Sequence, residues 1–415
     1  MSAAMKVGID RIGAWPATLA LDMKDLCEAR GHDLADIRDV MMIDQRSVNP
    51  PWEDPVTMAV NAAQTILTEQ DRRDIGLLIV ASESGVDQEK PLSTWVQRYL
   101  GLRSNVRNFE IKHACYGGTA GVKLAASWIA SGTAGKNAKA LVVTTDQSRM
   151  HLGKPYEFVM GAGASAVLVS AEPRLVELEL DRYGVFTHEV SDLTRPTSRV
   201  ETGNSETSLL SYLEALDGAI EDYVARAGES VDYEATFRKN IYHVPFGGIT
   251  LRAHHAALRK FRGGSVPRAE ARVSWQQRTE PTLAYVRRIG GTYSSSTFLA
   301  TLALMDRCAE LREGDRFSVY SYGSGSCSEL YSARVGPDAR AAASEAKLPF
   351  LLDARRKVSV REYEECERER TCWIDYGDFE PSTNGLGGWY ADRYAGKSLL
   401  VWKGAQEHYR RYAWS

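Results

Sequence analysis

The segment "IKHACYGGTAGVKLAASWIASG" (residues 111–132) leads through a glycine pair into a helix rich in small residues. Gly117 and Gly118 permit a tight strand-to-helix turn and a close approach of the backbone. Lys123 is the only charge in the helical pattern, which predicts that most of the helix surface is buried. Cys115 precedes this helix, and unpaired N–H groups at a helix N-terminus favour a thiolate.

Short apolar runs alternate with helical patterns on both sides of this segment. The runs at 75–82, 138–146 and 164–171 are continuous and apolar, which is typical of strands buried on both faces. Between the strands, a helix is expected to begin at Asp54 as N-cap with Pro55 at its first position. This alternation predicts an α/β layered architecture.

The second half of the chain repeats the pattern weakly. The stretch 240–248 reads as a strand running into a glycine loop, 291–306 as a serine-rich loop opening an apolar helix, and 315–335 as two strands around a glycine turn. We therefore predict an internal duplication, with one half at 1–172 and the other at 173–415. An amphipathic helix is expected at 206–228 and a charged surface helix at 360–373.

Composition excludes several classes of function. The chain has 415 residues, 44% of them apolar and 25% charged, with a formal net charge of -3, so it offers no overall basic field for nucleic acid. No apolar run reaches the length of a membrane-spanning helix, and no signal-peptide pattern opens the sequence. Six scattered cysteines without a Cys-x-x-Cys pair suggest neither a metal site nor a disulfide framework. A cytoplasmic enzyme is expected.

Cys115 has two readings of similar weight from local sequence. It is either a buried structural cysteine or a nucleophile, for which the N–H groups of Gly117, Gly118 or Cys115 itself would form an oxyanion hole. A nucleophile needs a base or an orienting group. Glu83 follows a buried strand, where an apolar pocket would raise its pKa toward neutrality.

Of the eight histidines, His243 stands out because it ends a predicted strand and precedes a glycine loop, where sites form in α/β folds. His254 and His255 are expected on a helix surface, and the role of His113 stays open. The remaining four histidines have no supporting context: His32, His151, His188 and His408.

Four separated motifs resemble those of the 3-hydroxy-3-methylglutaryl (HMG) synthases of the thiolase superfamily. They are "ASESGVD" (81–87), "HACYGGTAG" (113–121), "YHVPFGG" (242–248) and "SYGSGSCSELYSARV" (321–335), and the resemblance covers nearly the whole chain. The segments "EDPVTMAVNAA", "FEIKHACYGGTAG" and "HYRRYAWS" are most similar to the subgroup that acts in polyketide β-branching. The resemblance implies two stacked halves in five αβαβα layers, and a homodimer.

The resemblance also implies a mechanism. Cys115 would take an acetyl group from a donor acyl carrier protein, and Glu83 would remove a proton from the acetyl methyl. The enolate would attack the β-ketone of a second carrier-bound chain, with His243 holding the acceptor carbonyl, and water would cleave the Cys115 thioester. No bound cofactor or metal is implied, because the substrates arrive on phosphopantetheine.

The same resemblance implies a substrate-binding set in the serine-rich loop and the C-terminal glycine turn: Gly291, Tyr293, Ser294, Tyr322, Gly323 and Ser324. The sequence departs from the family at "IGGTYSSSTF" (289–298), where Gly291 replaces an asparagine that positions the acyl carbonyl. A glycine has no side-chain donor, so a water or the Ser294 hydroxyl would have to substitute.

Carrier proteins are acidic, so the face of this protein that binds them should be locally basic. The run "LRAHHAALRKFRGG" (251–264) supplies four candidate docking residues: Arg252, Arg259, Lys260 and Arg262. The alternative interpretation is that this run is only the solvated face of a helix. Reversing Arg259 and Lys260 should then raise KM for a carrier-bound substrate and leave a short free thioester unaffected.

Three other readings compete with the carrier-protein synthase. The first is the coenzyme A enzyme of isoprenoid metabolism, which donor preference would distinguish. The second is a non-catalytic scaffold that binds carrier proteins, motivated by Gly291. The third is a decarboxylating condensation, against which Glu83 argues because decarboxylation needs no base to form the enolate.

Overall fold

The computed structural model describes residues 6–148, 151–227 and 231–415. Its main feature is a nine-stranded sheet in the order β11-β12-β13-β8-β1-β7-β6-β4-β5. The strands are β1 (Gly8–Pro16), β4 (Ile75–Ala81), β5 (Arg107–Ile111), β6 (Lys139–Gln147), β7 (Ala162–Ser170), β8 (Val176–Thr187), β11 (Lys239–Tyr242), β12 (Arg316–Gly323) and β13 (Cys327–Val335). The predicted strands are therefore present in both halves of the chain.

The sheet consists of two half-sheets with the same pairing pattern. In the first, β1–β7 and β7–β6 are antiparallel and β6–β4 is parallel. In the second, β8–β13 and β13–β12 are antiparallel and β12–β11 is parallel. The halves are joined at β1–β8 through Gly8↔Glu177 and Ile9↔Val176. This repeated topology confirms the predicted duplication.

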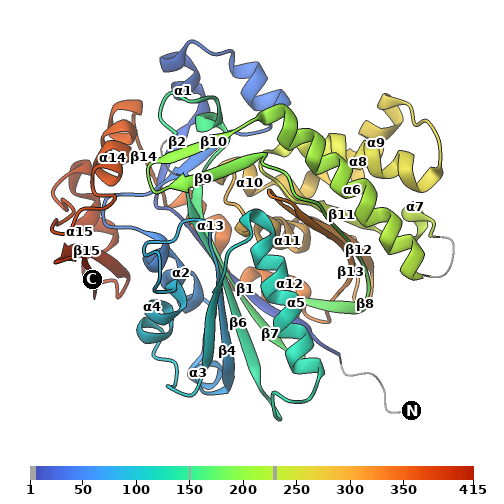
Figure 1. Cartoon of the computed structure of the whole chain (residues 1–415), viewed down its shortest axis with the longest axis horizontal. Coiled ribbons are helices and arrows are strands. Elements are labelled where there is room, and N and C mark those ends of the chain that lie inside the picture. The colour runs from blue at the N-terminus through green and yellow to red at the C-terminus, as the bar shows by residue number, and fades with distance from the viewer. Residues whose placement is uncertain (1–5, 149–150, 228–230) are drawn as a thin grey trace.

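Helices cover both faces of the half-sheets in layers (Figure 1). Helices α5 (Gly117–Ala130) and α11 (Ser295–Arg307) lie between the half-sheets and share one apolar core with them. Helices α2 (Pro55–Gln64) and α4 (Leu92–Tyr99) cover the outer face of the first half, and α6 (Ser205–Ala227) and α8 (Gly247–Arg262) that of the second. Along β4, Ile79 faces the central core while Leu78 and Val80 face the outer core, so the strand is buried on both faces as predicted.

Local signals explain several helix starts. Asp54 accepts a hydrogen bond from Thr57 N at 2.9 Å, and Pro55 occupies the first turn, as the sequence predicts. Helix α6 begins one residue earlier than expected, and residue 228, at the end of the predicted helix, lies outside the described residues. Helix α14 (Val360–Cys372) matches the predicted charged helix.

Smaller elements surround this framework. The strands are β2 (Leu19–Asp22), β3 (Gln45–Val48) and β14 (Arg356–Lys357) in one sheet, and the hairpins β9 (Leu193–Thr197)–β10 (Val200–Gly203) and β15 (Leu400–Gln406)–β16 (Tyr409–Trp414). The helices are α1 (Met23–Arg30), α3 (Glu69–Asp74), α7 (Tyr233–Thr236), α9 (Arg268–Arg278), α10 (Val286–Ile289), α12 (Ala339–Ser344), α13 (Leu348–Asp353) and α15 (Trp389–Arg393). Within the described residues, no helix is both long enough and apolar enough to cross a membrane.

Candidate active site

Cys115 lies in a tight turn where the two halves of the chain meet. The turn, a 3₁₀ segment at Ala114–Tyr116, leads directly into α5, and Ala114 has a positive φ of 41°. Ser294, from the loop before α11, holds this turn: its Oγ donates to Cys115 O at 2.9 Å and accepts from Gly118 N at 3.0 Å. The Gly118 amide is therefore occupied and is not a free oxyanion donor.

Glu83 follows β4 and is held at three points. Its amide donates to Asp146 Oδ1 at 2.8 Å, and its carbonyl oxygen accepts from Arg195 Nη1 at 2.5 Å. Its carboxylate oxygen Oε1 accepts from the amide of Ala114 at 2.6 Å. The side chain of the candidate base is thus fixed against the residue that precedes Cys115.

Burial governs the ionisation of the nucleophile. The pKa of the Cys115 thiol is raised well above its ordinary value, first by burial and then by the carboxylates of Asp146, Glu83 and Asp192. The expectation that the helix N-terminus would lower this pKa is wrong, because burial of the thiol, followed by the charges of the three carboxylates, outweighs the helix dipole. Cys115 is a thiol at neutral pH.

The two carboxylates next to the thiol also have raised pKa values. Burial is the largest cause of the raised Glu83 pKa, and the Ala114 amide and Arg195 oppose it. Burial and the charge of Glu83 raise the pKa of Asp146 to about 8. Both carboxyl groups therefore hold a proton more readily than an ordinary carboxyl group, which favours general acid–base chemistry.

His243 directly follows β11, as predicted, and is buried. Its amide donates to Tyr320 O at 2.7 Å, and its carbonyl accepts from the Tyr212 hydroxyl at 3.0 Å. Burial lowers the pKa of His243 to about 3, so its imidazole is neutral at physiological pH. The contact of 3.4 Å between Nδ1 and Ser296 Oγ is too long to fix the tautomer.

The serine-rich loop connects His243 to the nucleophile. Ser296 contacts His243 and donates to Tyr293 O at 2.8 Å, while Ser294 two residues earlier holds the Cys115 turn. Tyr293 has a positive φ of 49°, and its hydroxyl accepts from Arg195 Nη2 at 3.1 Å. The site therefore combines four segments: those that carry Glu83, Cys115 and His243, and the serine-rich loop.

Two predicted site glycines are required by close packing. A Cβ at Gly323 would lie 2.6 Å from His113 O and 2.7 Å from Tyr116 N, on the two sides of Cys115. A Cβ at Gly291 would lie 2.6 Å from Pro245 O, in the loop after His243. The glycine at 291 thus lets the two loops touch through their backbones, in addition to removing the family's asparagine.

The other predicted binding residues lie in the C-terminal glycine turn. The Tyr322 hydroxyl donates to Asp192 Oδ2 at 3.1 Å and contacts Ser211 Oγ at 2.9 Å. Ser324 is partly exposed at the turn between β12 and β13. Asp192 therefore connects this turn electrostatically to Cys115.

The candidate docking cations differ in their partners. Lys260 pairs with Glu221, and Arg262 pairs with Glu234 and Glu270 at 2.5 Å each. Arg252 and Arg259 are exposed on α8, and among the described residues neither side chain has an ion pair or a hydrogen bond. Half of the predicted basic patch is therefore neutralised by the protein itself.

The prediction that His254 lies on a helix surface is wrong. His254 is fully buried, with Nδ1 3.1 Å from the Tyr242 hydroxyl and Nε2 2.9 Å from Ser274 Oγ. The inward side of α8 carries it against β11 and α9, which local sequence does not reveal. His255 is partly buried and contacts Val266 O at 2.8 Å.

Sequence reasoning missed three charged residues of the site: Asp146, Asp192 and Arg195. A signal existed for Asp146, because it ends a predicted strand beside the one that precedes Glu83, and parallel neighbours end at the same sheet edge. Arg195 lies in the short hairpin β9–β10, whose sequence contains no signal of its position.

A cysteine, a glutamate and a histidine gathered at the junction of two duplicated α/β halves define an acyl-transferring condensing enzyme of the thiolase-like fold. Models of the N-terminal and C-terminal parts of hydroxymethylglutaryl-coenzyme A synthase match residues 44–173 and 266–393. The chain belongs to the hydroxymethylglutaryl-CoA synthase family.

Similar proteins come from two branches of this family. The polyketide biosynthesis 3-hydroxy-3-methylglutaryl-ACP synthase PksG of Bacillus subtilis (strain 168) is 36% identical over 373 residues, which cover 87% of each protein. The hydroxymethylglutaryl-CoA synthase of Enterococcus faecalis is 32% identical over 362 residues, 87% of this chain and 91% of that one. The crystal structure of the curacin biosynthetic pathway HMG synthase is 36% identical with a TM-score of 0.92, covering 99% of this chain and 100% of that chain.

Proposed function

We propose that the enzyme acts in polyketide β-branching: it condenses an acetyl group, delivered by an acyl carrier protein (ACP) to Cys115, with the β-ketone of a second ACP-bound chain. The observation that carries this proposal is the contact of 2.6 Å between Glu83 Oε1 and the amide of Ala114. It supports the proposal because it holds the carboxylate of Glu83, whose pKa is raised, next to the cysteine that would carry the acetyl group.

The proposed reaction has three steps. In the first, the Cys115 sulfur displaces pantetheine from the acetyl carbonyl, and the thiol proton leaves with the pantetheine sulfur. In the second, Glu83 takes a methyl proton, the enolate carbon bonds to the ketone carbon, and Glu83 returns the proton to the new alkoxide. In the third, water cleaves the Cys115 thioester, and the product is a β-hydroxy-β-carboxymethyl chain on its carrier.

The ionisation states support these roles. The pKa of Glu83 is raised, which suits a single carboxyl group that acts first as base and then as acid. His243 is neutral, so it would contact the acceptor carbonyl through a hydrogen bond and not through a positive charge. The raised pKa of Cys115 implies that its thiol loses the proton during the attack on the donor thioester.

Relatives support carrier proteins as the source of the acyl groups. The curacin HMG synthase has been crystallised with an acetyl donor-ACP, and that structure matches this chain with a TM-score of 0.93 at 35% identity. The alternative donor is acetyl-coenzyme A, as the name of the Enterococcus faecalis relative implies. The relatives are named as synthases, which argues against a non-catalytic scaffold.

Intact mass spectrometry distinguishes these readings. The protein and its Cys115→Ala variant are mixed with acetyl-ACP or with acetyl-coenzyme A, and the mass of the protein is followed in time. Faster acetylation of the parent by acetyl-ACP, with none in the variant, is the expected result. Equal or faster loading from acetyl-coenzyme A would favour the coenzyme A enzyme, and no loading from either donor would favour the scaffold.

For carrier docking we propose the exposed face of α8 that carries Arg252 and Arg259, which are one heptad apart and so share a helix face. Their replacement by glutamate should raise KM for acetyl-ACP and leave KM for a short free thioester unchanged. The double variant Lys136→Glu, Arg340→Glu, which changes the charge equally at exposed positions outside α8, is the control. An equal effect on both substrates would refute the docking face.

Two further parts of the proposal concern the state of the protein. A homodimer is supported by β5, an edge strand whose residues are all at least partly exposed, and light scattering during gel filtration tests it. A cytoplasmic location is supported by six free cysteines, and fractionation of the producing cell tests it.

A further inference from the structure

The hairpin β9–β10 reaches Glu83 from the opposite half of the chain. One guanidinium makes the connection: Arg195 Nη1 donates to Glu83 O at 2.5 Å, and Nη2 donates to the Tyr293 hydroxyl at 3.1 Å. The candidate base and the serine-rich loop therefore share one side chain that the family motifs do not contain.

The guanidinium is held firmly within the hairpin. Arg195 Nε and Nη2 both donate to Glu201 Oε2, at 3.0 and 2.5 Å, and the Glu201 side chain is only 5% exposed. The hairpin tip is fixed as well, because Ser198 Oγ donates to Asp375 Oδ2 at 2.9 Å and Arg199 Nε to the same oxygen at 3.1 Å. Because Glu201 orients the guanidinium and Asp375 anchors the hairpin tip, Arg195 is pre-organised for its contacts with Glu83 and Tyr293.

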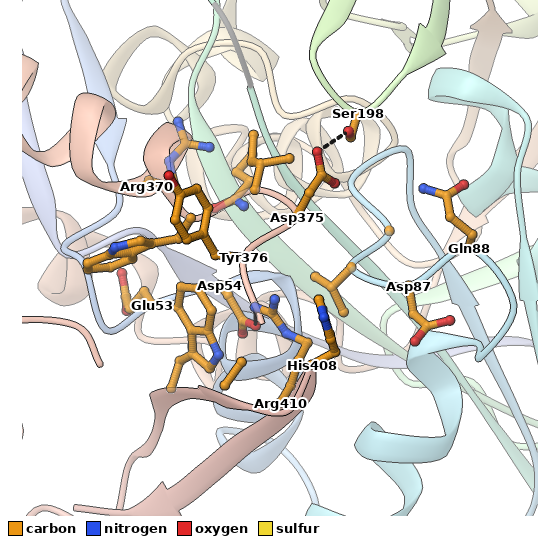
Figure 2. Close-up of a pocket in the computed structure, with 17 residues that line it drawn as sticks. Glu53, Asp54, Asp87, Gln88, Ser198, Arg370, Asp375, Tyr376, His408 and Arg410 are labelled. Atoms are coloured by element: carbon orange, nitrogen blue, oxygen red, sulfur yellow. Dashed lines mark hydrogen bonds and ion pairs between the residues drawn. The ribbon is translucent and has the colours of Figure 1, made fainter. Parts of the chain in front are cut away.

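Figure 2 shows where this attachment lies. A pocket of about 270 Å³ separates the loop that follows Glu83, which carries Asp87 and Gln88, from the C-terminal segment that carries Asp375. Ser198 points to Asp375 across the upper side of this pocket (Figure 2). The hairpin thus connects the C-terminal segment to Glu83. The loop that follows Glu83 borders the pocket.

The backbone of Glu83 is held between two groups. Asp146 accepts from its amide at 2.8 Å, and Arg195 donates to its carbonyl. Without the guanidinium, the carbonyl side of Glu83 would lose the bond that fixes the start of the loop next to the pocket. A small displacement there moves the carboxylate relative to the acetyl methyl, and misplacement of a reacting group by about 1 Å costs up to ~100-fold in rate.

We propose that Arg195 is a positioning residue for proton removal from the acetyl methyl: by holding the Glu83 carbonyl and the Tyr293 hydroxyl together, it sets the reach of the Glu83 carboxylate toward the group on Cys115. This inference rests on the proposed function. It assigns Arg195 to enolate formation, the step in which Glu83 takes a proton, and not to the loading of Cys115, in which the proposed mechanism gives Glu83 no part.

The charge of Arg195 adds a second, directional effect. Charged and titratable groups face Glu83 from each neighbouring element: Glu110, Lys112, Cys115, Asp146 and Arg195. Among them Arg195 favours the carboxylate, so its removal raises the pKa of Glu83. The acidic limb of the proton-removal rate should therefore move to higher pH, because the reaction requires the ionised base.

Deuterium uptake by the acetyl methyl isolates this step. Each enzyme is acetylated with acetyl-ACP, transferred to D₂O without acceptor, and the mass of the acetyl-enzyme is followed over a range of pH. The variants are Arg195→Met, Arg195→Lys and, as the matched control, Arg199→Met, which removes a cation from the same hairpin without contact to Glu83.

We expect Arg195→Met to load Cys115 normally but to take up deuterium about 10- to 100-fold more slowly, with the acidic limb shifted to higher pH. Arg195→Lys should restore the position of the limb and part of the rate, and Arg199→Met should behave as the parent. Uptake by Arg195→Met within about twofold of the parent would overturn the inference, as would equal losses in both Met variants. Failure of the parent itself to load or to take up deuterium would refute the proposed function instead.

Should Arg195→Met fail to fold, Glu201→Gln provides the second variant. It keeps the guanidinium but weakens the bond that orients it, so slower deuterium uptake with the limb at the parent's pH or below is expected. Unchanged uptake in Glu201→Gln together with unchanged uptake in Arg195→Lys would overturn the inference.

Discussion

Gly323→Ala should displace the turn that carries Cys115 without changing any polar side chain of the site. The added Cβ would lie 2.6 Å from His113 O and 2.8 Å from Tyr116 Cβ, whereas ordinary contacts begin at 3.4 Å, so the β12 end and the turn must separate by 0.6 to 0.8 Å (3.4 − 2.8 and 3.4 − 2.6). Overpacking of this kind costs about 1–3 kcal/mol in stability. Because the turn carries Cys115, we expect its acylation to slow by about 10- to 100-fold.

The assay is the time course of acetyl transfer from acetyl-ACP to Cys115 by intact mass, together with the unfolding temperature. Gly385→Ala is the matched control, since a Cβ there has nothing within 4 Å and the backbone has a φ of −78°. The control should acylate and unfold as the parent does. Acylation of Gly323→Ala at the parent's rate, with an unchanged unfolding temperature, would show that the turn yields without cost and would refute the reasoning.

Three further predictions follow from the same contacts. Gly291→Asn should lower both the unfolding temperature and the condensation rate, because its Cβ would meet Pro245 O at 2.6 Å; a gain in rate would contradict this packing. Asp146→Asn should leave the acidic limb of deuterium uptake in place, because a pKa of about 8 keeps Asp146 protonated while Glu83 titrates; a clear shift of the limb to lower pH would contradict it. The pKa of buried His254 is lowered to about 3, so the unfolded chain binds a proton there that the folded one does not, and stability falls as pH drops from about 6.5 toward 3. His254→Gln should therefore lose less unfolding temperature than the parent between about pH 7 and pH 5, and an equal loss would contradict the assignment.

Much of the candidate site could be predicted from the sequence because its residues stand at strand ends. Glu83 and His243 follow apolar runs that are strands in the structure, and Cys115 precedes a helix whose small residues let it lie between two half-sheets. The roles of these three residues stay predictions until the acylation and deuterium experiments are done. The division of the chain at 172 and 173 stays a prediction as well.

The ionisation of the nucleophile could not be predicted in the same way. A helix N-terminus is a local feature, and by itself it favours a thiolate. Burial of the thiol is the main cause that reverses this effect, and the carboxylates of Asp146, Glu83 and Asp192, from three other segments of the chain, add to it. Only folding brings them around one sulfur atom, so no window of sequence contains the sum of their charges.

The sequence alone determined the type and order of the strands and helices that it predicted around the site, since the spacing of apolar, proline and glycine residues acts over a few neighbouring positions. The tertiary structure alone decided which groups touch. Arg195 and Glu83 are 112 positions apart, and Ser294 and Cys115 are 179 apart, yet each pair is joined by a hydrogen bond. The glycines at 291 and 323 have the same physical reason: a Cβ there would meet backbone atoms of Pro245 and His113, which belong to other segments of the chain.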